Sequence, residues 1–231
     1  MQDFGKFVYL GMQKTASTYV NRFLIECCTL DMIAFKKHKP VREDYDSTKL
    51  YFITIRHPLS LYLSLYRYGL MKKGGLYKKL KSHNMLHCYS DITTFVDFIL
   101  DAENANYLDD GYDRFVAEEI GLMTFRFLRL ALNVKLRTIL PQTITKDFLL
   151  KLDSLLITNL EIKQEELKKG LNILATEKIP QYFNQSKCKS FLNKNEKINE
   201  SFEDNDLIQQ IDNETFKKIH LKESILLSRY D

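Results

Sequence analysis

Residues 7–18 read Phe-Val-Tyr-Leu-Gly-Met-Gln-Lys-Thr-Ala-Ser-Thr, and this stretch decides how the chain begins to fold. The first four residues are apolar or aromatic, as in a strand buried within a parallel sheet, and Gly11 ends the run. From Ser17 onward apolar side chains return at helical spacing, as at Val20 and Phe23, and Ser17 is expected to cap the helix. The stretch therefore predicts a strand, a tight loop and a helix.

A second unit of the same kind begins at residues 50–55, which are apolar almost throughout. This run predicts a central strand, and Pro58 is placed to start a helix expected over residues 59–68. The remaining pattern predicts helices at residues 92–100 (capped by Ser90 or Asp91), 112–132, 145–152, 165–174 and 216–227, short strands at residues 32–36 and 155–158, and a long loop at residues 181–205. The alternation predicts an α/β fold: a mostly parallel central sheet flanked by helices, with a largely helical middle and C-terminal part.

The length and composition indicate one soluble domain over residues 1–231. An excess of 34 basic over 30 acidic side chains is too small to indicate a nucleic-acid partner. The four cysteines have no spacing typical of disulfides, and no apolar run approaches the roughly 20 residues that span a bilayer. Residues 1–10 do not resemble a signal peptide, so we expect a cytoplasmic protein without an integral membrane segment.

Basic side chains gather in the middle of the sequence, with tyrosines nearby. The group consists of Lys72, Lys73, Lys78, Lys79 and Lys81, with Tyr68 and Tyr77. Such a run suits either an anionic acceptor or an ordinary solvated surface, and the sequence leaves both interpretations open.

The loop after the first strand is placed to bind phosphate. Backbone N–H groups at a helix N-terminus, together with the helix dipole, hold such anions, and the hydroxyls of Thr15, Ser17 and Thr18 are expected to add donors. The alternative is an ordinary capped helix. Gly11 stands only three positions before Lys14, which does not fit the Walker A spacing of ATP and GTP hydrolases.

The run from Lys14 to Thr18, Lys-Thr-Ala-Ser-Thr, resembles the 5′-phosphosulfate loop of sulfotransferases that use 3′-phosphoadenosine 5′-phosphosulfate (PAPS). Residues 53–60 are similar to the 3′-phosphate motif of that family, which has Arg-x-Pro after a central strand and a serine on the next helix. Arg56 offers a planar fork of donors and Ser64 a hydroxyl from the following helix. Seen alone, this pair would be a surface arginine and a helix serine.

A third stretch, Ile179-Pro180 followed by Asn184 and Ser186, is similar to a late segment of several carbohydrate sulfotransferases. Together the resemblances imply a P-loop-like fold, PAPS as donor, no metal, and in-line transfer to an acceptor hydroxyl, expected on a carbohydrate. The residues they assign to PAPS binding are Gly11, Gln13, Lys14, Thr15, Ala16, Ser17, Thr18, Arg56, Ser64, Asn184 and Ser186. The middle third is unmatched, so lipid, small-alcohol and peptide acceptors stay open.

Two side chains are expected to carry the chemistry. Lys14 would stabilise the charge that develops on the bridging oxygen as the donor bond breaks. His38 is the favoured base, because the carboxyl edge of a parallel sheet would bring it to both phosphate motifs, and Glu26 is the weaker candidate. The group His83, His87 and Cys88 has partial metal-ligand spacing but no evident fourth ligand.

Two other functions fit part of the pattern. One is a P-loop-like nucleotide kinase, disfavoured because no Walker A glycine precedes Lys14 and no Mg²⁺ aspartate follows residues 50–55. The other is a non-catalytic module that binds nucleotide or glycan. The presence of Lys14 at the predicted transfer point argues against it.

Overall fold

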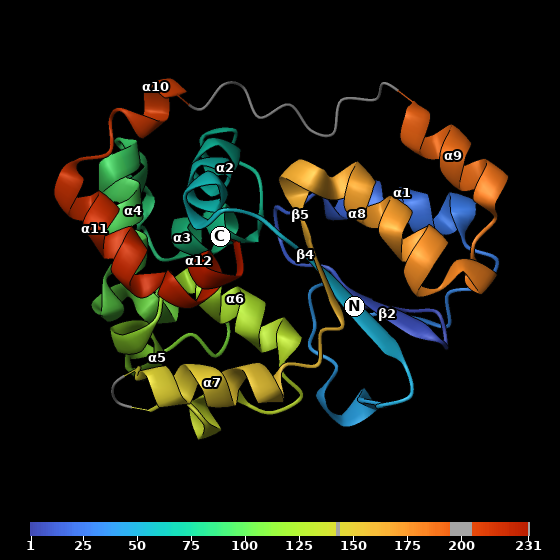
Figure 1. Ribbon diagram of the computed structural model, residues 1–231. Coiled ribbons are helices and arrows are strands. Elements are labelled where there is room, and N and C mark those ends of the chain that lie inside the picture. The colour runs from blue at the N-terminus through green and yellow to red at the C-terminus, as the bar shows by residue number, and fades with distance from the viewer. Residues whose placement is uncertain (142–143, 195–204, 231) are drawn as a thin grey trace. The chain divides into compact units, whose positions relative to one another are not determined.

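The computed structural model of the protein describes residues 1–141, 144–194 and 205–230 (Figure 1). The chain divides into two compact units. The first unit comprises Met1–Arg56, Leu130–Val134 and Leu155–Glu200, and the second comprises His57–Arg129, Lys135–Ser154 and Ser201–Asp231. The expectation of one domain over residues 1–231 stays a prediction.

A five-stranded sheet forms the centre of the first unit, in the order β3-β1-β2-β4-β5. Its strands are β1 (Gln2–Asp3), β2 (Phe7–Leu10), β3 (Ala34–Phe35), β4 (Leu50–Ile55) and β5 (Leu160–Lys163). Strands β2, β4 and β5 are parallel, whereas β1 is antiparallel to both of its neighbours. The α/β fold is confirmed, and the sheet is mixed, with its parallel half on β2, β4 and β5.

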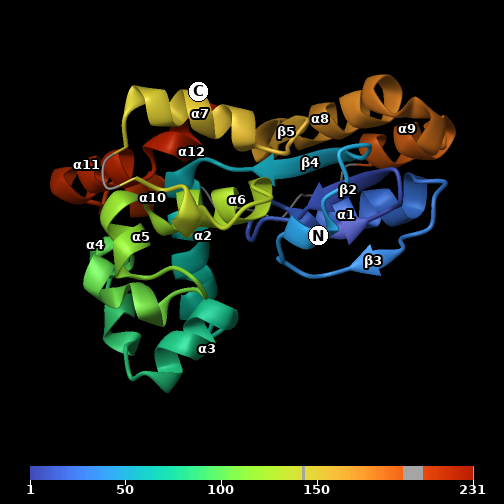
Figure 2. The same cartoon turned by 90° about the horizontal axis from the view of Figure 1, so that it is seen from below.

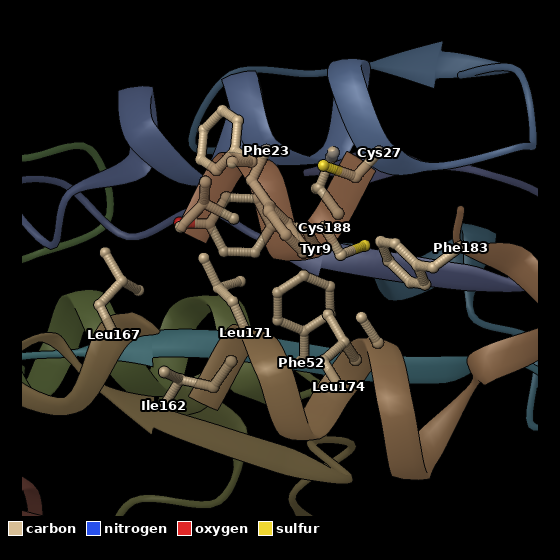
Figure 3. Close-up of a cluster of buried hydrophobic side chains, with 14 of the residues drawn as sticks. Tyr9, Phe23, Cys27, Phe52, Ile162, Leu167, Leu171, Leu174, Phe183 and Cys188 are labelled. Atoms are coloured by element: carbon tan, nitrogen blue, oxygen red, sulfur yellow. The ribbon is translucent and has the colours of Figure 1, made fainter. Parts of the chain in front are cut away.

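Three helices of the first unit share one hydrophobic core with the sheet (Figure 3). They are α1 (Ser17–Cys27), α8 (Leu167–Ile173) and α9 (Gln185–Asn193). The parallel register places Tyr9 opposite Phe52, so these two rings point to the same face and stack 4.9 Å apart. Figure 3 shows both rings among side chains from all three helices. Burying one such ring contributes roughly 1.5–3 kcal/mol to the stability of the fold. Because side chains of α1 belong to the same core, this burial holds α1 against the strand that precedes it.

The second unit is built from helices. They are α2 (Pro58–Leu70), α3 (Gly75–Ser82), α4 (Ile92–Leu100), α5 (Arg114–Glu119), α6 (Leu122–Ala131), α7 (Lys146–Leu155), α10 (Asn205–Ile208), α11 (Asn213–Lys222) and α12 (Ser224–Tyr230). The last residues of α6 and α7 are counted with the first unit. The predicted α4 is confirmed, and Asp91 caps it by accepting a hydrogen bond from the Thr94 N–H at 2.8 Å. Short 3₁₀ turns lie at Arg42–Asp44, Leu86–Tyr89, Ala102–Tyr107, Leu136–Thr138, Gln164–Glu166 and Pro180–Tyr182, and a π turn at Leu174–Lys178 continues α8.

Two helices expected to be continuous are each divided in two, and Glu223 explains the break between α5 and α6. The carboxylate of Glu223, between α11 and α12, accepts hydrogen bonds from the backbone N–H groups of Met123 and Thr124 in the first turn of α6. A Cβ on Gly121 would collide with that carboxylate. Glu223 therefore caps α6 from a distant part of the sequence and requires a glycine where α5 and α6 separate.

Two predicted elements are wrong. The strand expected at residues 155–158 lies instead at β5, because α7 continues to Leu155. The loop expected at residues 181–205 contains α9, which buries Cys188 and Phe191, and residues 195–204 lie outside the described residues. Of the helices that the structure describes, none is both long enough and apolar enough to cross a membrane.

Candidate phosphate-binding site

The loop between β2 and α1 has an unusual backbone. Lys14 (φ 65°) and Ala16 (φ 59°) both adopt the left-handed conformation, on either side of Thr15. Each such non-glycine residue costs roughly 1–2 kcal/mol, so other contacts must hold the loop in place. When left-handed and right-handed backbone conformations alternate, successive N–H groups point to the same side. Such a group of N–H donors forms a backbone anion site. Ala16 takes the N-cap position of α1, so the prediction that Ser17 caps the helix is wrong.

A chain of buried hydroxyls holds this loop to the sheet. The Thr15 hydroxyl donates to the Met12 carbonyl at 3.0 Å and lies 2.7 Å from Thr54 Oγ1. The Tyr9 hydroxyl lies 2.7 Å from the same Thr54 oxygen. Each hydroxyl has one proton to donate, and a carbonyl can only accept. Tyr9 therefore donates to Thr54, Thr54 donates to Thr15, and Thr15 donates to the Met12 carbonyl. Burial raises the pKa of Tyr9, which keeps the first donor protonated.

These hydrogen bonds correct the expectation that the Thr15 hydroxyl donates to a bound phosphate. The hydroxyl proton of Thr15 is used inside the protein, and the side chain is fully buried. Thr15 can therefore serve a phosphate through its backbone N–H and not through its hydroxyl. Ser17 is half-buried and Thr18 is exposed at the start of α1, as donors to a ligand need to be.

Two cations meet at the end of the parallel strands. Arg56 follows directly on β4, and the loop with Lys14 follows on its parallel neighbour β2, so both lie at the carboxyl edge of the sheet. Arg56 is only 7% exposed. Burial and, after it, the charge of Arg56 lower the pKa of Lys14. An anion at this edge would relieve the repulsion between the two side chains.

His38 is brought to the same loop. Because β1 is antiparallel to both neighbours, β3 runs in the direction of β2, and the residues after β3 return to the carboxyl edge. His38 Nδ1 lies 2.7 Å from the Gly11 carbonyl oxygen. That oxygen can only accept, so Nδ1 carries the proton and Nε2 is the nitrogen whose lone pair can take another.

Glu26, the weaker candidate for the base, lies far along α1. It is nine residues beyond Ser17, or about 14 Å along the helix axis. Its carboxylate makes ion pairs with Arg22 at 3.8 Å and Lys194 at 3.6 Å. These positions favour His38 over Glu26.

Asn184 and Ser186 are not brought to the loop. The Asn184 side chain caps α9, accepting from the Lys187 N–H at 3.1 Å and the Ser186 hydroxyl at 2.8 Å. Its backbone N–H donates to the carbonyl of Cys27, at the C-terminal end of α1. The phosphate loop is at the other end of that 11-residue helix, about 16 Å away. We therefore correct the role of Asn184 and Ser186 to the capping of α9.

Ser64 lies on α2 in the second unit and is half-buried, and its expected partnership with Arg56 stays a prediction. The side chains considered for zinc have other neighbours: Cys88 is buried, and the His83 and His87 rings pack near Tyr107 and Phe98. Within the described parts of the chain, no three His, Cys, Asp or Glu side chains are grouped so that they could hold a metal ion.

Sequence reasoning missed Tyr9 and Thr54 as parts of this site. Both belong to central strands and were predicted only as core. The available signal was Thr54 itself, a hydroxyl between Ile53 and Ile55 in an otherwise apolar strand, since a buried hydroxyl needs a partner. Comparisons with protein-family models, with curated proteins and with solved structures find no match to this chain.

Proposed function

We propose that this protein is a P-loop-like, PAPS-dependent sulfotransferase that transfers a sulfuryl group to an acceptor hydroxyl, on a carbohydrate. One observation carries the proposal: Lys14 and Arg56 come together at the carboxyl edge of two parallel strands, close enough for the charge of Arg56 to lower the pKa of Lys14. Such an edge supports the binding of a ligand with more than one anionic group.

The residues present suit the two phosphates of PAPS. The loop between β2 and α1, with left-handed Lys14 and Ala16, offers backbone N–H groups and the ammonium of Lys14 for the 5′-phosphosulfate. Arg56 offers the planar guanidinium, with donors matched to phosphate oxygens, for the 3′-phosphate. This division separates PAPS from ATP, which lacks a 3′-phosphate.

PAPS, when bound, supplies an activated sulfuryl group. A bond forms between the acceptor oxygen and sulfur, and the bond from sulfur to the bridging oxygen of the 5′-phosphate breaks. Lys14 stabilises the negative charge on that bridging oxygen, which is greater in the transition state than in the ground state. Nε2 of His38 takes the acceptor proton, while the bond from Nδ1 to Gly11 keeps the ring oriented.

The 3′-phosphate assignment is tested by calorimetry with a matched pair of ligands. 3′-Phosphoadenosine 5′-phosphate (PAP) and adenosine 5′-phosphate differ only in the 3′-phosphate, and PAP should bind more tightly. Arg56→Ala should reduce that preference about tenfold to a hundredfold, because hydrogen bonds to charged groups contribute about 1.5–3 kcal/mol. ATP binding as tightly as PAP would contradict the proposal and favour a nucleotide kinase.

The transfer role is tested with PAPS carrying labelled sulfate and a panel of sugar, lipid and peptide acceptors. Lys14→Ala should abolish transfer while retaining most PAP affinity, and His38→Gln should lower the transfer rate. Lys6→Ala, at an exposed lysine before β2, is the matched control and should leave transfer unchanged. PAP binding without transfer to any acceptor would identify a non-catalytic binding module instead.

A further inference from the structure

The turn between α2 and α3 exposes apolar side chains next to lysines. Tyr68, Leu70 and Met71 are 38%, 51% and 57% exposed, and the next two residues, Lys72 and Lys73, are exposed lysines. Figure 2 shows α3 following α2 in the second unit. We call these five residues the α2–α3 surface. Exposed apolar side chains gathered at one turn mark an interaction site more often than single ones do.

The charged side chains of the segment that forms this surface are all basic. No Asp or Glu stands between His57 and Ser90, whereas residues 91–119 contain nine. The basic side chains in the first of these stretches are Arg67, Lys72, Lys73, Lys78, Lys79 and Lys81. In α3 the leucines Leu76 and Leu80 are buried while Lys78 and Lys81 are exposed, so this helix presents its lysines to solvent. Lys79 is paired with Asp110 at 3.8 Å. With that pair counted, the segment still carries a net positive charge, which attracts anions.

The backbone of the turn adds an independent observation. The Lys72 N–H bonds to the Gly69 carbonyl at 2.7 Å and the Lys73 N–H to the Tyr68 carbonyl at 3.0 Å, which is the Schellman ending of a helix. Glycine is the usual residue at the left-handed position of this motif, but here Lys72 holds it, at φ 58°. A lysine is thus present where local stability favours glycine, and its charge supplies a reason.

We propose that the α2–α3 surface binds the face of an anionic lipid bilayer. Met71, Leu70 and the ring of Tyr68 would enter the interface between headgroups and acyl chains, and the lysines would contact anionic headgroups. A soluble polyanion would explain the lysines but not the apolar side chains beside them. This proposal stands independently of the sulfotransferase reaction, because neither PAP binding nor transfer enters its test.

Co-sedimentation of the full chain with vesicles tests the proposal. Binding to vesicles of phosphatidylcholine with phosphatidylserine should exceed binding to phosphatidylcholine alone and should weaken as salt is raised. Lys72→Gly should lower the partition coefficient about fivefold, the equivalent of about 1 kcal/mol per lysine. The same substitution should not lower the urea midpoint of unfolding, because glycine adopts the left-handed conformation of this position without strain.

The apolar contribution is tested with Leu70→Ser and Met71→Ser together, which should also reduce vesicle binding at least fivefold. The matched control is Leu150→Ser with Lys151→Gln, a leucine (63% exposed) and an exposed lysine on α7 of the same unit, which should leave binding unchanged. Equal binding to neutral and anionic vesicles would overturn the proposal. Full retention of binding by the Leu70 and Met71 variant would also overturn it and identify a site for soluble polyanions, which dextran sulfate would then occupy.

Discussion

At the scale of single residues, three hydroxyls decide the shape of the candidate site. Those of Tyr9, Thr54 and Thr15 form a directed chain that ends on the Met12 carbonyl and connects two central strands to the loop. All three side chains are fully buried, so water cannot replace a lost partner. The chain explains how left-handed conformations at Lys14 and Ala16 persist in a loop without a glycine at either position.

Thr54→Val is the sharpest test of that chain. It keeps the shape of the side chain but leaves the hydroxyls of Tyr9 and Thr15 without their shared partner. We expect a loss of about 1–3 kcal/mol in the free energy of unfolding, the usual cost of unsatisfied buried groups, together with weaker PAP binding. Tyr9→Phe removes only the first donor and should cost less. Urea unfolding measures both variants, and an unchanged midpoint for Thr54→Val would show that the chain does not hold the loop.

The lowered pKa of Lys14 predicts how the stability of the protein depends on pH. Its pKa in the folded protein lies below the ordinary 10.5, so between these two values the unfolded chain binds more protons than the folded one. Stability should therefore increase as the pH rises through this window, as far as Lys14 is concerned. Arg56→Gln should raise the pKa of Lys14, because it removes a neighbouring positive charge, and PAP should raise it as well.

NMR titration of the lysine side chains measures the effect, with Lys14→Ala identifying the resonance. The same Lys14 pKa with and without Arg56 would mean that the two cations do not share one site.

At the scale of elements, Glu223 sets where α6 begins. It lies between α11 and α12, accepts hydrogen bonds from the first turn of α6, and is approached closely by the backbone at Gly121. Gly121→Ala should lower the free energy of unfolding by about 1–3 kcal/mol, the usual cost of overpacking a buried site, because the Glu223 carboxylate would have to leave its hydrogen bonds.

The matched control for this effect is Gly75→Ala at the start of α3, where a new Cβ would meet no atom within 4 Å. That variant should be neutral, or more stable by about 0.4–1 kcal/mol, since it restricts the unfolded chain. Urea unfolding of the two variants gives the comparison. Equal midpoints would show that contact with Glu223 does not require a glycine at position 121.

The elements that could be predicted from sequence are those whose own side chains determine them. β2 and β4 are continuous apolar runs, and α4 has both a periodic apolar face and an aspartate cap, so these three were predicted with correct bounds. β5 alternates polar and apolar side chains, whereas residues 155–158 are more apolar. The sequence therefore predicts the strand at residues 155–158 and not at β5. The break between α5 and α6 depends on Glu223, 100 residues from Met123, which no local pattern reveals.

The candidate site was predictable to the extent that topology determines it. Lys14, Arg56 and His38 each follow a strand, so the direction of the strands brings them to one edge. The hydroxyl chain depends on cross-strand register, which sequence alone does not give. Asn184 was misplaced because a cap and a ligand-binding amide look alike until the helix that follows is known.

At the scale of the whole molecule, neither unit is a continuous piece of chain. The first unit takes β4 from one segment and β5 from another more than 100 residues later, and these two strands are hydrogen-bonded neighbours. The residues between them belong mostly to the second unit. Neither unit can therefore complete its fold from one contiguous segment, which favours cooperative unfolding of both.

We accordingly expect a single urea transition for the whole chain. Circular dichroism, which is dominated by the helices of both units, and the fluorescence of the 13 tyrosines should give coincident curves. PAP should shift both curves to the same higher midpoint, because a ligand that binds only the folded protein stabilises every part that unfolds with its site. Two separated transitions, with only one of them shifted by PAP, would contradict the single domain predicted over residues 1–231 and assign the nucleotide to the unit that shifts.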